Sequence, residues 1–210
     1  MPVIIRDAQL NDAPALLEIK RELHLSGLEP QRGGFLLGTT LEGYEAFICQ
    51  DHVIVAEDAG RVLGFVILLG QETLMQSDLW ARASTAKLNL PFEQVLSRGR
   101  IAYVEQLAMR SSHASRVYAK YLAYHSLNRA FLEHATVFTT VVREPVSNDA
   151  VLPFLEVAGF VSVGSIAEDY PNVGRIQSEI FALSSDVFQE RLRRANFQLF
   201  LRKGQRAGLI

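Results

Sequence analysis

Cysteine is nearly absent from this 210-residue sequence, and its scarcity excludes several kinds of stabilisation and chemistry. Cys49 is the single cysteine, so the chain has no internal disulfide and no thiolate cluster for zinc. The five histidines form no His-x-His or His-x-x-x-His pair, so the pattern gives no support for metal catalysis. We therefore expect no metal cofactor and a reducing, cytoplasmic location.

Long apolar runs and a strong charge of either sign are also missing. No apolar run approaches about 20 residues, and the opening segment MPVIIRDAQLND already contains an arginine and two aspartates. We therefore expect neither a signal peptide nor a membrane-spanning helix. The net charge is -2 and the pI is about 6.2, so no whole-protein field attracts nucleic acid or an anionic membrane.

The residues that are present predict a chain of alternating strands and helices. The hairpin prediction is the clearest, because two apolar runs flank the turn residues Asp-Ala-Gly. The expected order is a short N-terminal strand, a helix from residue 11 or 12, a helix in 41–50, a hairpin in 52–70, helices near 77–84 and after Pro91, a strand at 101–109, a helix at 116–134, a strand at 135–143, a short helix in 147–159, strands at 160–166 and 178–184, and a helix at 185–205.

This order predicts an α/β fold with a central mixed sheet of about six to seven strands flanked by helices. The hairpin makes the early strands antiparallel, and the crossover within 101–143 makes the central pair parallel. Ligands favour the carboxyl ends of crossover strands, here residues 107 to 119. We expect one domain at residues 1–184, with an insertion at about 71–98, and a C-terminal helical extension at 185–210.

The stretch YVEQLAMRSSHASRVYAKYL, residues 103–122, begins as a strand and becomes a helix through the six residues SSHASR. A strand that runs into a helix through small residues directs free backbone amides at one point, where they bind phosphate well. The same pattern also occurs as a plain connecting loop in any α/β protein. Both interpretations stay open on this stretch alone.

Three stretches together resemble the GNAT superfamily of acyl-CoA N-acyltransferases, in the order the family has them. They are IIRDAQLNDAPALLEI, VIVAEDAGRVLGFVIL and NDAVLPFLEVAGFVSVG, the last of which is similar to the late motif N-x-x-A-x-x-F-Y-x-x-x-G-F. With residues 101–142, the resemblance covers most of residues 3–183. It implies a GNAT-like fold, acetyl-CoA or another acyl-CoA as co-substrate, and transfer of the acyl group to a small-molecule or protein amine.

The resemblance also implies where the cofactor binds. The family loop Q/R-x-x-G-x-G/A falls on residues 114–119, where only Ala119 conforms, and the β-branched Val117 is expected to crowd the phosphates. Ser115 and Arg116 offer a hydroxyl and a cation in partial compensation. Asn148 is either a cofactor contact or a helix cap. The implied cofactor-binding residues are Leu107, Ala108, Met109, Ala114, Ser115, Arg116, Val117, Tyr118, Ala119 and Asn148.

Glu105 is the candidate general base, because a carboxylate on this strand can take the proton that an ammonium substrate must lose. Strand alternation places Tyr103, Glu105, Leu107 and Met109 on one face, which makes Tyr103 the next candidate. The alternative is a buried glutamate paired with an arginine, Arg6 or Arg143. Where the family often has a tyrosine that protonates the leaving thiolate, this chain has Leu155.

Two interpretations of the whole chain follow. It is an N-acetyltransferase, or it is a degenerate GNAT-like module that binds an acyl-CoA or a protein partner without turnover.

Residues 33–40 are either the acceptor wall or an ordinary connector. The tail has no acidic residue after Glu190 and several basic ones, which indicates a solvated face or contact with nucleic acid or phospholipid. Its apolar stripe, Phe188, Leu192, Ala195 and Leu199, is expected to dock on the domain or on a second subunit of a homodimer.

Overall fold

The computed structural model describes residues 3–23, 36–37, 39–50, 52–81, 83–89, 94, 97, 99–110, 113–170 and 174–210, with the backbone alone at 113–116. The strands are β1 (Ile4–Asp7), β2 (Val53–Asp58), β3 (Arg61–Leu69), β4 (Lys87–Leu88), β5 (Ile101–Met109), β6 (Thr136–Glu144), β7 (Val161–Tyr170) and β8 (Gly174–Ser184). The helices are α1 (Ala13–Glu22), α2 (Leu41–Cys49), α3 (Gln71–Gln76), α4 (Asp78–Ala81), α6 (His113–Ala130), α7 (Leu152–Ala158), α8 (Ser185–Leu192) and α9 (Ala195–Arg206). Short 3-10 turns are η1 (Leu10–Asp12), η3 (Ala83–Thr85) and η4 (Asp149–Val151).

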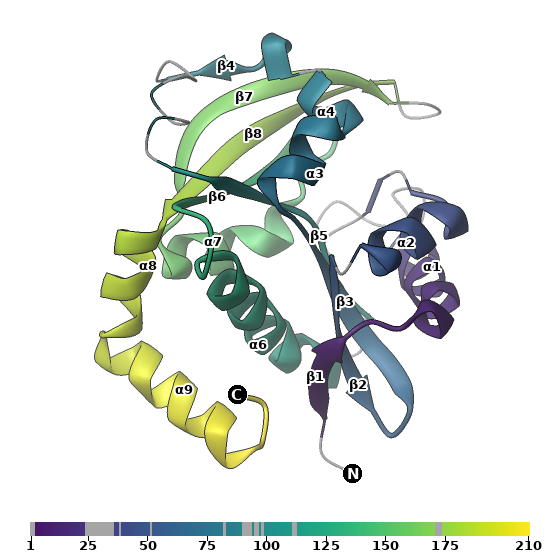
Figure 1. The fold of residues 1–210 in the computed structure, drawn as a ribbon, viewed down its shortest axis with the longest axis vertical. Helices are drawn as coiled ribbons and strands as arrows, with labels where there is room; N and C mark the ends of the chain where they lie inside the picture. Colours follow the sequence, from purple (N-terminus) through teal and green to yellow (C-terminus); the bar gives the residue numbers. More distant parts are fainter. Residues whose placement is uncertain are drawn as a thin grey trace.

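The strands form a single mixed sheet in the order β1-β2-β3-β5-β6-β8-β7-β4 (Figure 1). Among the described residues, β5 and β6 alone pair in parallel, joined by the crossover helix α6, and every other neighbouring pair of strands is antiparallel. The predicted mixed sheet is therefore confirmed, with eight strands rather than six or seven. The short strand β4 lies in the 71–98 insertion and covers the edge of β7.

Helices cover both faces of the sheet, and each face has its own core. On one face, α1 and α2 contribute the fully buried Leu16, Ile19 and Tyr44. On the other, α6, α7 and α8 contribute Leu127, Leu155 and Phe188 to a second cluster. In Figure 1 the two groups of helices stand on opposite sides of β3 and β5. The sheet is therefore the middle layer, and any opening between its strands connects the two faces.

Two predicted turns form as their residues require. At the β2–β3 hairpin, Ala59 and Gly60 both have positive φ angles, 50° and 82°, which match the twist of a two-residue hairpin turn. Gly159 ends α7 in the left-handed region at φ 97°, where its amide and that of Phe160 bond to the carbonyl of Leu155. Glycine favours the positive φ angles of Gly60 and Gly159, because a β-carbon is strained in that region, and Ala59 bears that strain in the hairpin.

Strand β5 carries a β-bulge that determines which of its side chains face which layer. Against β3, Gln106 pairs with Ile67 and Val104 pairs with Leu68, so Glu105 is the extra residue between them. An extra residue shifts the alternation of side chains by one position. Tyr103 and Ala108 accordingly pack in the α1–α2 core, whereas Leu107 and Met109 pack with the opposite cluster. The prediction that Tyr103, Leu107 and Met109 share one face was therefore wrong.

Several predicted element boundaries also differ. Helix α6 begins at His113, three residues before the predicted start, and ends at Ala130. The insertion forms α3, α4, η3 and β4, and the helix predicted after Pro91 lies outside the described residues. Strands β7 and β8 are longer than predicted, because they pair with each other along almost their whole length. The predicted terminal helix is two helices, α8 and α9, separated at Arg193 and Arg194.

The C-terminal extension packs on the chain's own α6. Phe200 stacks on Tyr121 with ring centroids 4.4 Å apart, and Nε2 of His125 lies 2.6 Å from the carbonyl oxygen of Leu209. A β-carbon at Gly204 would lie 2.6 Å from the ring of Tyr121, so glycine permits the close approach of α9. The predicted docking on the domain is therefore observed, although the residues involved differ in part.

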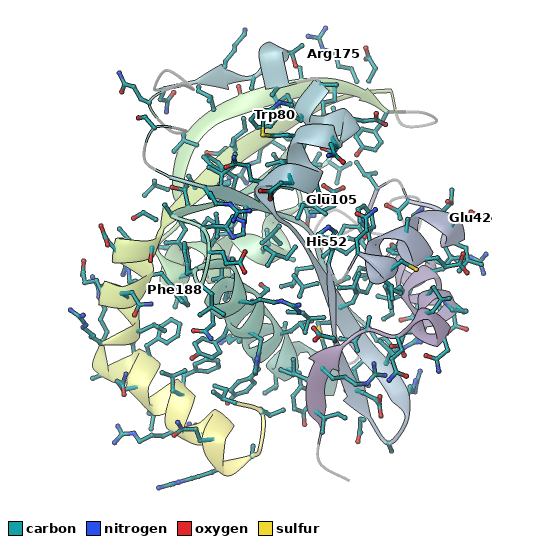
Figure 2. The ribbon with its side chains drawn as sticks, in the orientation of Figure 1. Glu42, His52, Trp80, Glu105, Arg175 and Phe188 are labelled. Carbon is teal, nitrogen blue, oxygen red and sulfur yellow. The ribbon has the colours of Figure 1, made fainter. Side chains whose placement is uncertain are left out.

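The break between α8 and α9 explains which tail residues are buried. Phe188 is buried and Leu192 packs beside it, as the predicted stripe required (Figure 2). Ala195 is exposed and Leu199 is 50% exposed, so the second half of the stripe was wrong. A break in a helix rotates the following residues about the axis, and here it turns Phe200 toward α6.

We expect Phe200→Ala to lower the free energy of unfolding by about 2 kcal/mol, because it removes an aromatic stack and leaves a void beside Tyr121. Leu199→Ala is the matched control on the adjacent residue. The side chain of Leu199 is half exposed, so its loss should lower the free energy of unfolding by less than about 0.5 kcal/mol. Urea unfolding measures both. Equal midpoints for the two variants would contradict the packing of α9 on α6.

Candidate active site

The two parallel strands at the centre of the sheet separate partway along their length. β5 and β6 pair from Ile101 opposite Thr136 to Val104 opposite Thr139, and no pairing joins them beyond that point, although both strands continue. The hydroxyl of Thr139 donates to the carbonyl of Val104 at 3.0 Å, at the last paired position. The strand edge of β5 that faces β6 is therefore open from Glu105 onward.

A cavity of about 780 Å³ occupies this opening and reaches both faces of the sheet. Its floor consists of β5 and β6 residues, including Tyr103, Glu105 and Thr140. One side is formed by α6, η4 and α7, and the opposite side by the end of α1, the segment 36–37 and the β7–β8 hairpin. Two molecules entering from opposite faces would therefore meet at Glu105.

The predicted catalytic residues both line this cavity, and Glu105 lies on β5 near the centre of the molecule (Figure 2). The arginines considered as its partners contact other carboxylates: Arg6 contacts Asp12 and Glu57, and Arg143 contacts Asp149 and Glu179. Because Glu105 is the bulged residue, its position is set by β5 itself.

Tyr103 is buried at the base of the opening, where its hydroxyl lies 2.7 Å from the hydroxyl of Thr140. Burial raises the pKa of Tyr103 well above its usual range, the nearby charge of Glu105 raises it further, and the bond with Thr140 lowers it. Glu168 and Tyr170 of β7 also raise this pKa. Tyr103 therefore stays a neutral phenol and is a hydrogen-bonding group rather than a base.

The predicted cofactor residues lie in three places. Leu107, Ala108, Met109, Ala119 and Asn148 line the cavity. Asn148 stands at the N-terminal end of η4 but makes no side-chain cap there. Ala114, Ser115 and Arg116 belong to the first turn of α6, where a helix presents free amides.

The remaining two predicted cofactor residues are not part of the cavity lining. The side chain of Val117 is 59% exposed on the second turn of α6 and does not line the cavity, so its predicted crowding of the phosphates stays a prediction. Tyr118 packs beside the cluster under the C-terminal extension. Leu155, at the position of the family tyrosine, is buried in the α7 core and lines the cavity as an apolar surface.

Several further polar residues of the cavity were not predicted, among them Gln106, Thr140, Glu168 and Tyr170. Gln106 follows Glu105 in the same apolar strand, so the signal that indicated Glu105, a polar residue in an apolar run, applied equally to Gln106. Thr140 was not singled out within its β-branched run. Glu168 and Tyr170 reach the cavity only because β7 pairs with β8, and nothing in the sequence indicated that register.

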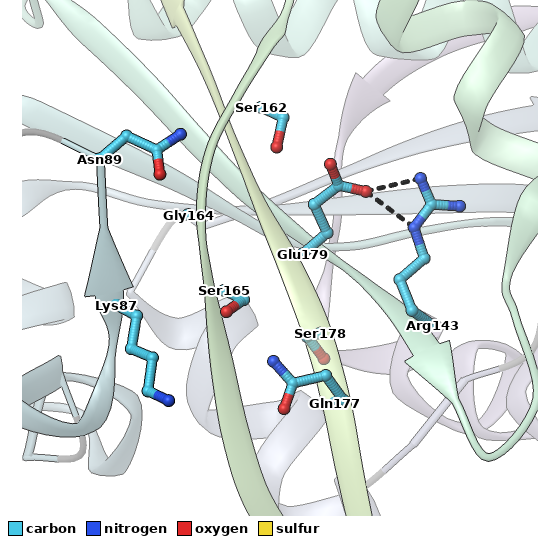
Figure 3. A pocket seen from close by; sticks show the side chains of 9 residues that line it. All are labelled: Lys87, Asn89, Arg143, Ser162, Gly164, Ser165, Gln177, Ser178 and Glu179. Carbon is cyan, nitrogen blue, oxygen red and sulfur yellow. Dashed lines mark hydrogen bonds and ion pairs between the residues drawn. The ribbon is translucent and has the colours of Figure 1, made fainter.

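A second, shallower hollow of about 430 Å³ lies where β4, β6, β7 and β8 meet (Figure 3). Its main charges satisfy each other, because Arg143 donates to Glu179 at 2.6 and 2.8 Å. The hydroxyl of Ser162 and the guanidinium of Arg143 lower the pKa of Glu179. This pairing leaves the hollow with little to offer a ligand, so the central cavity is the better candidate site.

Within the described ranges, no three His, Cys, Asp or Glu side chains are grouped so that they could hold a metal ion. No helix in the part of the chain that the structure describes is both long and apolar enough to cross a membrane.

No protein-family model and no curated protein matches this sequence. Solved structures do match its fold. A ribosomal-protein-alanine N-acetyltransferase from Brucella melitensis is 16% identical with TM-score 0.56, covering 86% of this chain and 98% of the other. Naa50 from Arabidopsis thaliana, in complex with the bisubstrate analogue CoA-Ac-MVNAL, is 12% identical with TM-score 0.58, covering 88% and 99%. An agmatine N-acetyltransferase is 11% identical with TM-score 0.60, covering 88% and 100%.

These similarities show that the chain has the fold of the GNAT N-acetyltransferases, which confirms the fold that the sequence resemblance implied. The match extends over nearly the full length of each solved chain. The chain therefore has the GNAT fold, and its two parallel central strands separate partway along their length.

The raised pKa of Tyr103 predicts a loss of stability at alkaline pH. In the unfolded chain the tyrosines lose their phenolic protons at about pH 10. In the folded chain Tyr103 keeps its phenolic proton to higher pH. The folded state then binds more protons, so the free energy of unfolding falls as pH rises. Between about pH 9 and 11 we expect a smaller fall for Tyr103→Phe than for the wild type in urea unfolding. Equal slopes would show that burial does not hold this phenol neutral.

Proposed function

We propose that this chain is an acyl-CoA-dependent N-acyltransferase that transfers acetyl from acetyl-CoA to a primary amine by direct attack. The observation that carries the proposal is the opening between β5 and β6, which has the carboxylate of Glu105 on its wall and is accessible from both faces of the sheet. A transfer between two substrates needs one shared point with a proton acceptor beside it.

The backbone around the opening fits an acyl-CoA. The β5 edge beyond Val104 is not paired with β6, so an extended amide-containing arm can lie beside it as a further strand. The first turn of α6 follows β5 after a short connection and offers free amides to a pyrophosphate. Lys120 and Asn148 line the same side of the cavity and add polar contacts there.

Each residue then has a role in the reaction. The carboxylate of Glu105 takes a proton from the ammonium form of the acceptor, directly or through one water. The free amine nitrogen attacks the thioester carbonyl carbon, the new C–N bond forms, and the C–S bond breaks. The nitrogen that has attacked then loses one more proton and the thiolate takes one up, so the products are the N-acetyl amine and coenzyme A. The neutral phenol of Tyr103 donates a hydrogen bond near the reacting groups.

The solved proteins with a similar fold guide the choice of acceptor for testing. They include a ribosomal-protein-alanine N-acetyltransferase, an agmatine N-acetyltransferase, and a NatC complex bound to a Gag peptide and CoA. These names support both the amine class of acceptor and acyl-CoA as co-substrate. A peptide with a free N-terminal alanine and agmatine are therefore the first two acceptors to test.

We expect Ala119→Glu to weaken acetyl-CoA binding by tenfold or more, because it places a negative, bulky side chain on the cavity wall beside the first turns of α6. Ala195→Glu is the matched control, since Ala195 is exposed at the start of α9. Isothermal calorimetry with acetyl-CoA measures both affinities. No heat with the wild-type protein at millimolar acetyl-CoA would contradict the proposed site.

Glu105→Gln keeps the shape of the side chain and removes the proton acceptor. We expect thiol release to fall by roughly 100-fold with acetyl-CoA affinity nearly unchanged. The deficit should shrink as pH rises from about 6 to 9, because more of the acceptor is then already a free amine. An equal rate for both proteins across this range would assign Glu105 a structural role.

The same assay separates the enzyme from the alternative, a GNAT-like module that binds acyl-CoA or a partner without turnover. A wild-type protein that binds acetyl-CoA but releases no thiol with any amine of a broad panel is a binding module. The buried Leu155 in place of the family tyrosine is the specific observation that favours this alternative.

A further inference from the structure

We propose that Gln106 is a positioning residue that holds the acceptor-side wall of the cavity, the segment formed by the described residues 36, 37, 39 and 40. This inference rests on the proposed function, because it identifies which side of the cavity receives the amine. Because that wall lies on the acceptor side, Gln106 affects the affinity for the acceptor and leaves the affinity for acetyl-CoA unchanged. Its evidence is a buried hydrogen-bond network that the mechanism does not use.

The side chain of Gln106 connects β5 to two segments far away in the sequence. Gln106 is 6% exposed, and its Oε1 accepts from the hydroxyl of Tyr44 at 3.0 Å. Its Nε2 donates to the hydroxyl of Thr39 at 3.1 Å and toward the carbonyl of Leu37 at 3.4 Å. One amide thus fixes helix α2 and the segment before it to the strand that carries Glu105.

Thr39 is held in a conformation that it would not adopt unaided. Its φ angle is 57°, in the left-handed region that is unfavourable for a β-branched residue. Two side chains restrain it, because Gln106 bonds to its hydroxyl and Nζ of Lys20 donates to its carbonyl at 2.5 Å. Without these bonds the local strain favours a different backbone path before α2.

The restrained segment forms part of the cavity. Leu36 and Leu37 line the cavity on the side opposite α6, and the amide of Leu36 bonds to the carbonyl of Leu23, another lining residue, at 3.1 Å. Acetyl-CoA fits the α6 side, where the unpaired edge and helix amides lie, so the acceptor enters past Leu36 and Leu37. Movement of this segment would therefore alter the acceptor's surroundings first.

The β-bulge makes this coupling specific to the reaction. Because Glu105 is an extra residue in β5, the side chains of Glu105 and Gln106 both lie on the face of the sheet that α1 and α2 cover. The proposed base points into the cavity, and its neighbour holds the wall against which the amine would rest. One local backbone feature thus sets the distance between base and wall.

The test uses Gln106→Leu in the full-length protein, with a peptide bearing N-terminal alanine and agmatine as acceptors. We expect the acceptor KM to rise about tenfold, with kcat and the acetyl-CoA KM within about twofold, because the lost bonds hold the wall alone. Gln177→Leu is the matched control, as it makes the same change on β8 in the outer hollow. An acceptor KM that rises equally in both variants, or in neither, overturns the proposal.

Hydrogen exchange gives a second result that does not depend on turnover. In Gln106→Leu the peptide spanning residues 36–50 should exchange about fivefold faster, while the peptide spanning 136–144 is unchanged. If neither amine is acetylated by the wild type, the proposed function fails and exchange alone decides the positioning role. Unchanged exchange at 36–50 overturns that role.

The double variant Tyr44→Phe/Gln106→Leu separates positioning from stability. Gln106→Leu alone leaves the buried hydroxyl of Tyr44 without this acceptor, which destabilises the fold. The double variant removes that hydroxyl, so the free energy of unfolding should partly recover while the acceptor KM stays high. A KM that recovers together with stability would show that Gln106 matters only for folding.

Discussion

The separation of β5 from β6 is the constraint on which the rest of this structure depends. Four paired positions join the strands, and the hydroxyl of Thr139 makes one of the last bonds across them. Beyond that point β5 stays paired with β3 and β6 stays paired with β8. The opening therefore leaves only the β6-facing edge of β5 without a neighbouring strand beyond Val104. Buried backbone polar groups need hydrogen-bond partners, which is why this edge is the candidate binding site of the proposed function.

The fold could largely be predicted from periodicity and turn residues. The hairpin, the parallel crossover and the glycine that ends α7 all follow from local signals whose physical causes act over a few residues. The bulge at Glu105 could not be predicted, because strict alternation was assumed along the strand and no glycine or proline marks the extra residue. That single error transferred Leu107 and Met109 to the wrong face.

The unpredicted parts of the site depend on contacts between distant segments. Glu168 and Tyr170 reach the cavity through the register of β7 on β8, and Tyr44 reaches Gln106 across 62 positions of sequence. In the extension, Phe188 followed the predicted stripe, but the break at Arg193 and Arg194 changed which later residues face α6. A helical pattern identifies a face only as long as the helix is continuous, and no proline or glycine indicated the break.

The two departures from the family pattern place the burden of catalysis on one residue. Val117 stands where the family has a glycine, but its side chain is exposed and does not line the cavity, and backbone amides at a helix N-terminus can hold a pyrophosphate without side chains. Leu155 replaces an acid, but a thiol with a pKa of about 8.5 leaves tolerably as a thiolate. In the proposed reaction the harder step is then removal of a proton from an ammonium, whose pKa is about 8 for an α-amine and about 10 for an alkyl amine. The proposed mechanism assigns that step to Glu105, so the wall proposed to hold the amine against Glu105 would matter as much as the carboxylate itself.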